Sequence, residues 1–269
     1  PFDHDVHRIR HQEGAIAVAE SVRKWLDGSE KMSTPKDHVQ DPYSFRCIPQ
    51  VHGASRDVIS AARKLFENEV NAVTDNPLVF PDEDKVVSGG NFHGQPLALT
   101  LDHLTLAIHE LASISERRTF KLMSGTRSLP AFLAKDPGLH SGYMIAQYTA
   151  ASLVSMNKQL TTPSSADNAD SSNGQEDHVS MGANAALKLW KVIDNAEQVL
   201  AIEALCAAQA SDLGGMAGLG EMSPKLVKLQ ESLRESVPFL SQDAYMAPLL
   251  GDALSWIKNN LPEDIDKCH

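Results

Sequence analysis

The chain has 269 residues, of which 42% are hydrophobic and 22% charged, and its formal net charge is −11. That length fits one large domain or two small ones, and it can bury a core without disulfides or a structural metal. Nucleic-acid binding relies on clustered Lys and Arg, and the chain has no basic run. We therefore expect an ordinary globular protein with no nucleic-acid partner.

The three cysteines, Cys47, Cys206 and Cys268, are far apart and lack metal-binding or redox spacing. Free thiols suit a reducing compartment, so we predict a cytoplasmic protein. No apolar run approaches the roughly 20 residues of a membrane-spanning helix, and the polar start Pro1–His7 is unlike a signal peptide. We expect no membrane partner. The first residue is not Met, so we also expect the chain to be a piece of a longer protein.

Helical periodicity dominates the chain, whereas strand-like alternation is hard to find. From Pro96 to Met123, for example, Leu and Ile recur at steps of three and four, with charges on the opposite face. The predicted helices are, in chain order, Ala15–Leu26, Ala54–Val73, Pro96–Met123, Tyr143–Leu160, Met181–Ala210, Pro224–Ser236 and Leu249–Lys258. Several long amphipathic helices with almost no strand predict an all-α bundle.

Three polar loops, Gln40–Gly53, Val87–Gln95 and Thr161–Gly182, separate these helices. By composition the last resembles a disordered linker, but long loops between strong helices are more often functional. We expect residues 1–210 to form the central helical bundle that carries these loops. Residues 211–269 are expected to form a C-terminal helical tail packed on that bundle.

Arg46 and Tyr43 lie together in the first loop. The planar fork of Arg suits a carboxylate, and a Tyr hydroxyl can donate, accept or transfer a proton. Taken alone, a loop Arg is more often a surface ion-pair partner.

The second loop contains Gly89-Gly90-Asn91-Phe92-His93-Gly94, where glycines would let the backbone press Phe92 against a ligand. An ordinary turn before the next helix is an equal alternative. Glu176, in the third loop, precedes a helix and reads by itself as a capping carboxylate.

A metal site is not expected. His4, His7 and His11 have the spacing of one helix face, but no Cys, Asp or Glu pattern completes a metal signature. We expect a solvated helix face there.

Taken in order, the loops resemble the C-terminal half of the histidine ammonia-lyases, within the aromatic amino acid lyases. Gln40–Gly53 is similar to that group's Q-D-x-Y-S-x-R-C-x-P-Q-V-x-G, and the other matching stretches are Asp75–Phe80 with Ser88–His93, and Gln175–Gly182. The resemblance covers most of residues 1–210 and is weaker after Ser211. It implies an all-α long-helix bundle of the ammonia-lyase, aspartase-like type, assembled as a homotetramer whose active sites combine loops from several subunits.

The resemblance also implies an activity: the non-oxidative deamination of L-histidine to trans-urocanate and ammonia. Arg46 matches the residue that binds the substrate carboxylate, and Gln40 matches a pocket glutamine. Tyr43 matches a tyrosine beside the prosthetic group, Phe92 a phenylalanine beside the electrophile, and Glu176 a glutamate facing the imidazole or amine.

The electrophile implied by the resemblance is 4-methylidene-imidazol-5-one, which forms from an internal Ala-Ser-Gly in the group's N-terminal half. Ala-Ser-Gly does not occur in these 269 residues. We therefore expect that this chain by itself is inactive and that the cofactor and its other pocket residues lie outside it.

Two alternatives remain from the sequence. One is a related phenylalanine or tyrosine ammonia-lyase or aminomutase, although phenylalanine ammonia-lyases have Asn-Gln-Asp where this chain has Gln175-Glu176-Asp177. A carboxylate can pair with an imidazole N–H but not with a phenyl ring, which favours histidine. The other alternative is a helical scaffold without chemistry.

Overall fold

The fold is predominantly helical. The structure, a computed structural model, describes residues 1–32, 38–216 and 220–260, so Cys268 lies outside the described residues. The α-helices are α1 (His4–Arg8), α2 (Glu13–Leu26), α3 (Tyr43–Arg46), α4 (Ile48–Val70), α5 (Gln95–Leu122), α6 (Met144–Leu160), α7 (Gly182–Met216), α8 (Pro224–Arg234) and α9 (Met246–Asn259). The strands β1 (Leu78–Phe80) and β2 (Lys85–Val87) pair as an antiparallel hairpin.

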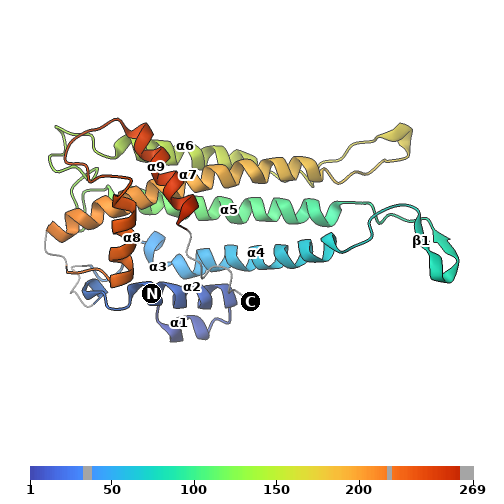
Figure 1. Cartoon of the computed structure of the whole chain (residues 1–269), viewed down its shortest axis with the longest axis horizontal. Coiled ribbons are helices and arrows are strands. Elements are labelled where there is room, and N and C mark those ends of the chain that lie inside the picture. The colour runs from blue at the N-terminus through green and yellow to red at the C-terminus, as the bar shows by residue number, and fades with distance from the viewer. Residues whose placement is uncertain (33–37, 217–219, 261–269) are drawn as a thin grey trace.

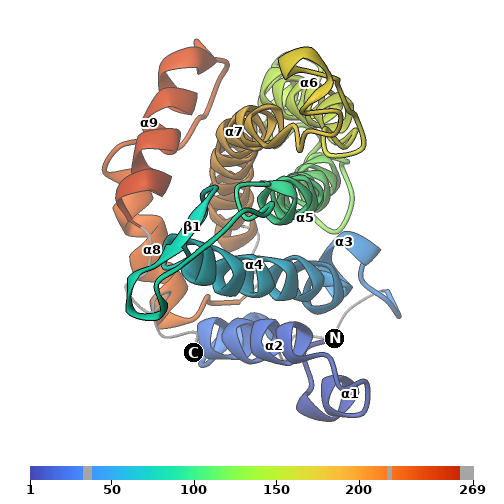
Figure 2. The ribbon, with the colours of Figure 1, turned by 90° about the vertical axis from the view of Figure 1, so that its right-hand side faces the viewer.

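The long helices α4, α5, α6 and α7 lie side by side along the longest axis of the molecule (Figure 1). An end view shows α2 under α4, α4 under α5, and α6 and α7 beyond α5 (Figure 2). This arrangement confirms the predicted all-α bundle. The β1–β2 hairpin and the α6–α7 connection both project from one end of the bundle, whereas α3 lies toward the other end (Figure 1).

The prediction that Gln40–Gly53 forms a loop is partly wrong. Residues 43–46 form the one-turn helix α3, and α4 already begins at Ile48, six residues before the predicted start. Pro49 sits in the first turn of α4, where a residue without an N–H costs nothing because first-turn N–H groups have no intrahelical acceptor. The polar composition of Gln40–Gly53 therefore concealed the start of a long helix.

The prediction of a solvated histidine face was also wrong. The helix α1 ends at Arg8, and His11 has φ +57°, so it does not continue the face of His4 and His7. His7 is only 3% exposed, and its Nε2 hydrogen-bonds the carbonyl oxygen of Pro1 at 2.8 Å. Within the described residues, no cluster of His, Cys, Asp and Glu has the geometry of a metal site.

The close contact between α2 and α4 depends on two glycines. A Cβ on Gly14 would lie 2.2 Å from the carbonyl oxygen of Gly53, and a Cβ on Gly53 would lie 2.4 Å from the backbone nitrogen of Ala15. Only residues without a side chain allow the two backbones to approach this closely. The contact fixes the N-terminal part of α4, and α3 directly precedes it.

The core combines side chains from both parts of the chain that the sequence analysis distinguished. Ile202 and Leu205 of α7 pack with Leu233 of α8 and with Met246 and Ala253 of α9. The helix α7 runs without interruption from Gly182 to Met216, through residues 210 and 211. The C-terminal helices therefore share one hydrophobic core with the bundle.

One helix in the described part of the chain, α5, is long and apolar enough to cross a membrane, which the sequence analysis did not anticipate. Core helices of bundles meet the same criterion. In this bundle α5 packs against α4, α6 and α7 and buries the charged residues Asp102, Glu116 and Arg118.

Candidate active site

The segment from Gln40 to Arg46 ends in a tight helical turn. The backbone N–H groups of Phe45 and Arg46 both donate to the carbonyl oxygen of Pro42 at 3.0 Å, and the N–H of Cys47 donates to the carbonyl oxygen of Tyr43 at 2.9 Å. Pro42, with φ −55°, is the N-cap residue of this turn. The turn places Tyr43 and Arg46 on the same side of α3.

Arg46 is stacked but incompletely paired. Its guanidinium carbon lies 4.4 Å from the centroid of the Tyr43 ring, a cation–π distance. Its Nε is buried and makes no hydrogen bond within the described residues. Leaving a buried donor unpaired costs about 1–3 kcal/mol, so this nitrogen is suited to an acceptor such as a carboxylate. Tyr43 is 72% exposed and remains accessible.

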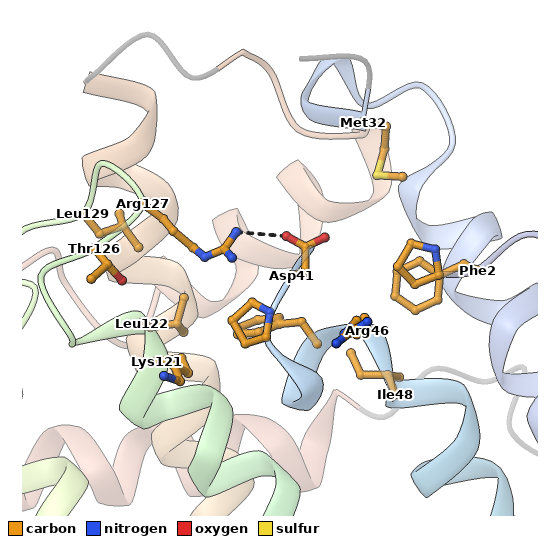
Figure 3. A pocket seen from close by; sticks show the side chains of 13 residues that line it. Phe2, Met32, Asp41, Arg46, Ile48, Lys121, Leu122, Thr126, Arg127 and Leu129 are labelled. Carbon is orange, nitrogen blue, oxygen red and sulfur yellow. Dashed lines mark hydrogen bonds and ion pairs between the residues drawn. The ribbon is translucent and has the colours of Figure 1, made fainter. Parts of the chain in front are cut away.

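Arg46 borders a cavity of about 350 Å³ (Figure 3). Most of its wall is apolar, and its cationic side chains come from α3, α5 and the segment after α5. The lining residues include the apolar Phe2, Phe45, Ile48, Leu122 and Leu129 and the cationic Arg46, Lys121 and Arg127. An apolar cavity bordered by the guanidinium of Arg46 suits the carboxylate of a small organic acid.

Arg127, which the sequence analysis did not single out, contacts the first residues of the segment Gln40–Arg46. Its Nη1 donates to Oδ1 of Asp41 at 3.0 Å (Figure 3), and its Nη2 donates to the backbone carbonyl oxygen of Gln40 at 2.9 Å. Gln40 is thus held through its backbone. No local sequence signal could have revealed these contacts, because Arg127 lies 86 residues after Asp41 and 87 residues after Gln40 in the sequence.

Phe92 lies beyond the hairpin, just before α5, and its side chain is 55% exposed. The side-chain oxygen of Asn76 closes the base of the hairpin by accepting hydrogen bonds from Ser88 Oγ at 2.9 Å and Gly89 N at 2.8 Å. Side chains added at Gly89 or Gly90 would meet open space. The two glycines are therefore not needed for close packing within this chain.

Glu176 does not cap a helix, since α7 begins six residues later at Gly182. Its Oε2 accepts a hydrogen bond from Ser171 Oγ at 2.8 Å, and the backbones of Ser171 and Glu176 also pair. Hydrogen bonds from the Ser171 and Ser172 side chains lower the pKa of Glu176. The side chain is consequently an exposed carboxylate that accepts hydrogen bonds at neutral pH.

His93 joins the loop of Phe92 to the loop of Glu176. Its Nδ1 accepts a hydrogen bond from the backbone N–H of Gln95 at 3.2 Å, which assigns the ring proton to Nε2. That Nε2 donates to the carbonyl oxygen of His178 at 3.1 Å, and the two imidazole rings lie 5.6 Å apart. Phe92 and Glu176 are therefore carried by two loops that contact each other.

The base of the Glu176 loop is anchored by Asp102 of α5. Its Oδ2 accepts a hydrogen bond from the backbone N–H of Ser165 at 2.7 Å, and its Oδ1 forms an ion pair with Lys188 of α7 at 3.1 Å. Burial raises the pKa of Asp102, but the hydrogen bonds from Ser165 and Lys188 outweigh it, so that the net pKa is lowered.

One chain does not bring the five predicted residues together. Gln40, Tyr43 and Arg46 lie near the N-terminal end of α4, whereas Phe92 and Glu176 lie beyond its C-terminal end (Figure 1). The helix has 23 residues and is therefore about 34 Å long, several times the length of an amino acid. The chain therefore presents two separate half-sites. The first half-site consists of Gln40, Tyr43 and Arg46, and the second consists of Phe92 and Glu176.

Comparison with known proteins places the chain in a family. The sequence model described as "Aromatic amino acid lyase" matches residues 1–235. The chain belongs to the aromatic amino acid lyase family. A relative named histidine ammonia-lyase, from Treponema denticola, is 49% identical over 267 residues, which are 98% of this chain and 52% of that protein.

Solved structures of the family have the same fold. Histidine ammonia-lyase from Trypanosoma cruzi superposes with a TM-score of 0.86 at 42% identity, over 98% of this chain and 51% of that one. Tyrosine aminomutase from Streptomyces globisporus gives 0.88 at 35% identity, over 96% and 53%. The chain spans about half the length of the family members that it matches.

Proposed function

We propose that the chain is the C-terminal portion of a histidine ammonia-lyase, which deaminates L-histidine non-oxidatively to trans-urocanate and ammonia. The observation that carries the proposal is Arg46, whose Nε is a buried, unpaired donor at the edge of a largely apolar cavity. The 49% identity to a protein of that name supports the choice of reaction.

In this proposal the first half-site binds the amino acid end of the substrate. Arg46 binds the carboxylate through charge-assisted hydrogen bonds, and Gln40 contributes an amide to the same wall. The hydroxyl of Tyr43, on the same side of α3, donates or accepts a proton near the reacting carbon. Stacking on Tyr43 restricts the guanidinium of Arg46, so less side-chain freedom is lost when substrate binds.

The second half-site recognises the side chain of the substrate. Glu176 is an acceptor whose lowered pKa keeps it ionised, so it can pair with an imidazole N–H. Phe92 offers an exposed aromatic surface against a planar group. A phenyl substrate has no N–H for this carboxylate, and an unpaired carboxylate becomes costly once substrate excludes water.

Because the half-sites lie beyond opposite ends of α4, a helix about 34 Å long, we propose that each complete site combines half-sites from different copies. Exposed apolar side chains on the bundle helices support such an assembly, for which we propose a homotetramer. These side chains include Leu99 and Leu106 of α5, Tyr148 of α6, and Leu187 and Trp190 of α7. Large exposed apolar side chains are common at subunit interfaces.

The proposed cofactor is 4-methylidene-imidazol-5-one, contributed by residues outside these 269, because Ala-Ser-Gly is absent from them. The exposed rings of Tyr43 and Phe92 and the unpaired Nε of Arg46 fit a planar electrophile with a substrate beside it. When bound, this group supplies an electron sink for cleavage of the carbon–nitrogen bond. The described residues of this chain hold the carboxylate and the imidazole and position a proton donor at Tyr43. No metal is required by this proposal.

An aminomutase is the second candidate, because tyrosine aminomutase from Streptomyces globisporus superposes as well as the ammonia-lyase does. The chain by itself would act only as a helical scaffold. We further propose that residues 1–210 carry the site loops and 211–269 support them, and that the enzyme is cytoplasmic.

Product analysis tests the proposal. The complete protein containing this chain would be incubated separately with L-histidine, L-tyrosine and L-phenylalanine, and unsaturated acids, β-amino acids and ammonia would be quantified. We expect urocanate and ammonia in equal amounts from histidine. Cinnamate or a β-amino acid without urocanate would refute the assignment, and activity of the 269 residues alone would refute the need for a second half.

A further inference from the structure

The segment Gln40–Arg46 is contacted at its N-terminal end by a side chain from a different part of the chain. Arg127 follows α5 and spans two acceptors, the carboxylate of Asp41 at 3.0 Å (Figure 3) and the backbone carbonyl of Gln40 at 2.9 Å. Both the charge and the planar fork are used, since one terminal nitrogen serves each acceptor. A Lys ammonium would not reproduce this paired geometry.

The segment that presents Arg127 has an unusual backbone. Arg127 and Ser128 have φ values of +59° and +65°, so two consecutive residues with side chains occupy the left-handed region. Neighbouring contacts hold them there: Leu129 N donates to Thr126 O at 3.2 Å, and Phe132 N donates to Met123 O at 3.0 Å. Such conformations persist only where the surroundings fix them, and they concentrate at functional sites.

The wall needs external support because α3 is a single turn. Isolated turns are unstable, and this one is closed by backbone hydrogen bonds from Phe45, Arg46 and Cys47. Downstream the turn is continuous with α4. Upstream, the fork of Arg127 fixes Gln40 and Asp41 immediately before the N-cap Pro42.

We propose that Arg127 is a positioning residue: by clamping Gln40 and Asp41 it fixes the turn in which Arg46 borders the cavity and stacks on Tyr43. It acts through Arg46 and does not itself bind substrate. This inference rests on the proposed function for its kinetic consequence, but the structural consequence can be measured on the 269-residue chain.

Hydrogen–deuterium exchange of the chain tests the clamp without reference to activity. Arg127→Met removes both contacts at similar side-chain length, and amides 45–47 should exchange about tenfold faster, as expected when a charge-assisted hydrogen bond is lost. Arg127→Lys should give a smaller increase. Amides 55–62 in α4 serve as the internal reference, and Lys135→Met, at an exposed position in the same segment, is the charge-matched control. Unchanged exchange at 45–47 would overturn the clamp.

Kinetics of the complete enzyme separate positioning from direct binding. Arg127→Met should raise KM for histidine about tenfold with a smaller change in kcat, and the effect should fall below about twofold in an Arg46→Lys background. Equal effects in both backgrounds would mean that Arg127 acts independently of Arg46, which refutes the proposal. If the unsubstituted enzyme does not deaminate histidine, the proposed function fails, while the exchange result still decides the clamp.

Discussion

His52 provides a sharp test of the bundle interior. Its Nε2 lies 3.1 Å from Nη1 of Arg118, which is 5% exposed and pairs with Glu203 of α7. Arg118 can only donate, so His52 must accept as a neutral ring. Burial, and secondarily the charge of Arg118, lower the pKa of His52 from 6.5 to about 4.

The sign of the pH effect follows from proton binding. The unfolded chain binds a proton at His52 near pH 6.5, whereas the folded chain resists it until about pH 4. The contribution of His52 to the free energy of unfolding is therefore highest above pH 6.5 and falls as the pH is lowered toward 4. Linkage with these two values gives a loss of about 2 kcal/mol between pH 7.5 and pH 5.

Urea unfolding of the wild-type chain and of His52→Gln, measured at several pH values from 7.5 to 5, isolates this contribution. The Gln amide oxygen can still accept from Arg118 but does not titrate. We expect the variant to gain about 2 kcal/mol relative to wild type as the pH falls to 5. Other titrating groups are common to both proteins and cancel in the difference. His4→Gln, at an exposed position, controls for loss of a histidine.

A difference in free energy of unfolding that stays constant with pH would refute the reasoning. It would mean that the ring is charged in the folded chain or that the Arg118 contact does not form. A steeper loss in the variant than in wild type would have the same meaning.

Three further predictions concern the half-sites. Arg46→Ala in the complete enzyme should raise KM and lower kcat, with a combined loss of about 1.5–3 kcal/mol in kcat/KM; Arg10→Ala, an exposed site, should leave both unchanged. Glu176→Gln should slow histidine turnover more than it lowers the thermal midpoint, and equal turnover would reduce Glu176 to a loop brace. Asp102→Asn leaves Lys188 without its buried partner, so urea unfolding should show a loss of about 3 kcal/mol, and amides 165–178 should exchange faster. Because the pKa of Asp102 is lowered, this stabilisation is present at neutral pH and is lost as the pH falls through that pKa.

Local sequence information was sufficient for most of the long helices and for the family. Apolar spacing located α5 within one residue at each end, because the side chains that face the core repeat every 3.6 residues. Composition and apolar spacing did not reveal the start of α4 or the β1–β2 hairpin. The polar stretch before Gly53 hid the start of α4 because Pro49 is tolerated in a first turn, and the three-residue strands of the hairpin are too short to show alternation.

The sequence by itself predicted which residues carry chemistry: Gln40, Tyr43 and Arg46 in one motif, Phe92 and Glu176 in two others. Only the tertiary structure decided how they are grouped. A helix is a rigid rod, so α4, with 23 residues and about 34 Å long, separates the end of the bundle that carries Arg46 from the end where the α6–α7 connection projects, and sequence order gives no hint of that separation. Arg127 was hidden for the same reason, because its contact with Gln40 exists only after α5 has returned along α4 to the end where α3 lies.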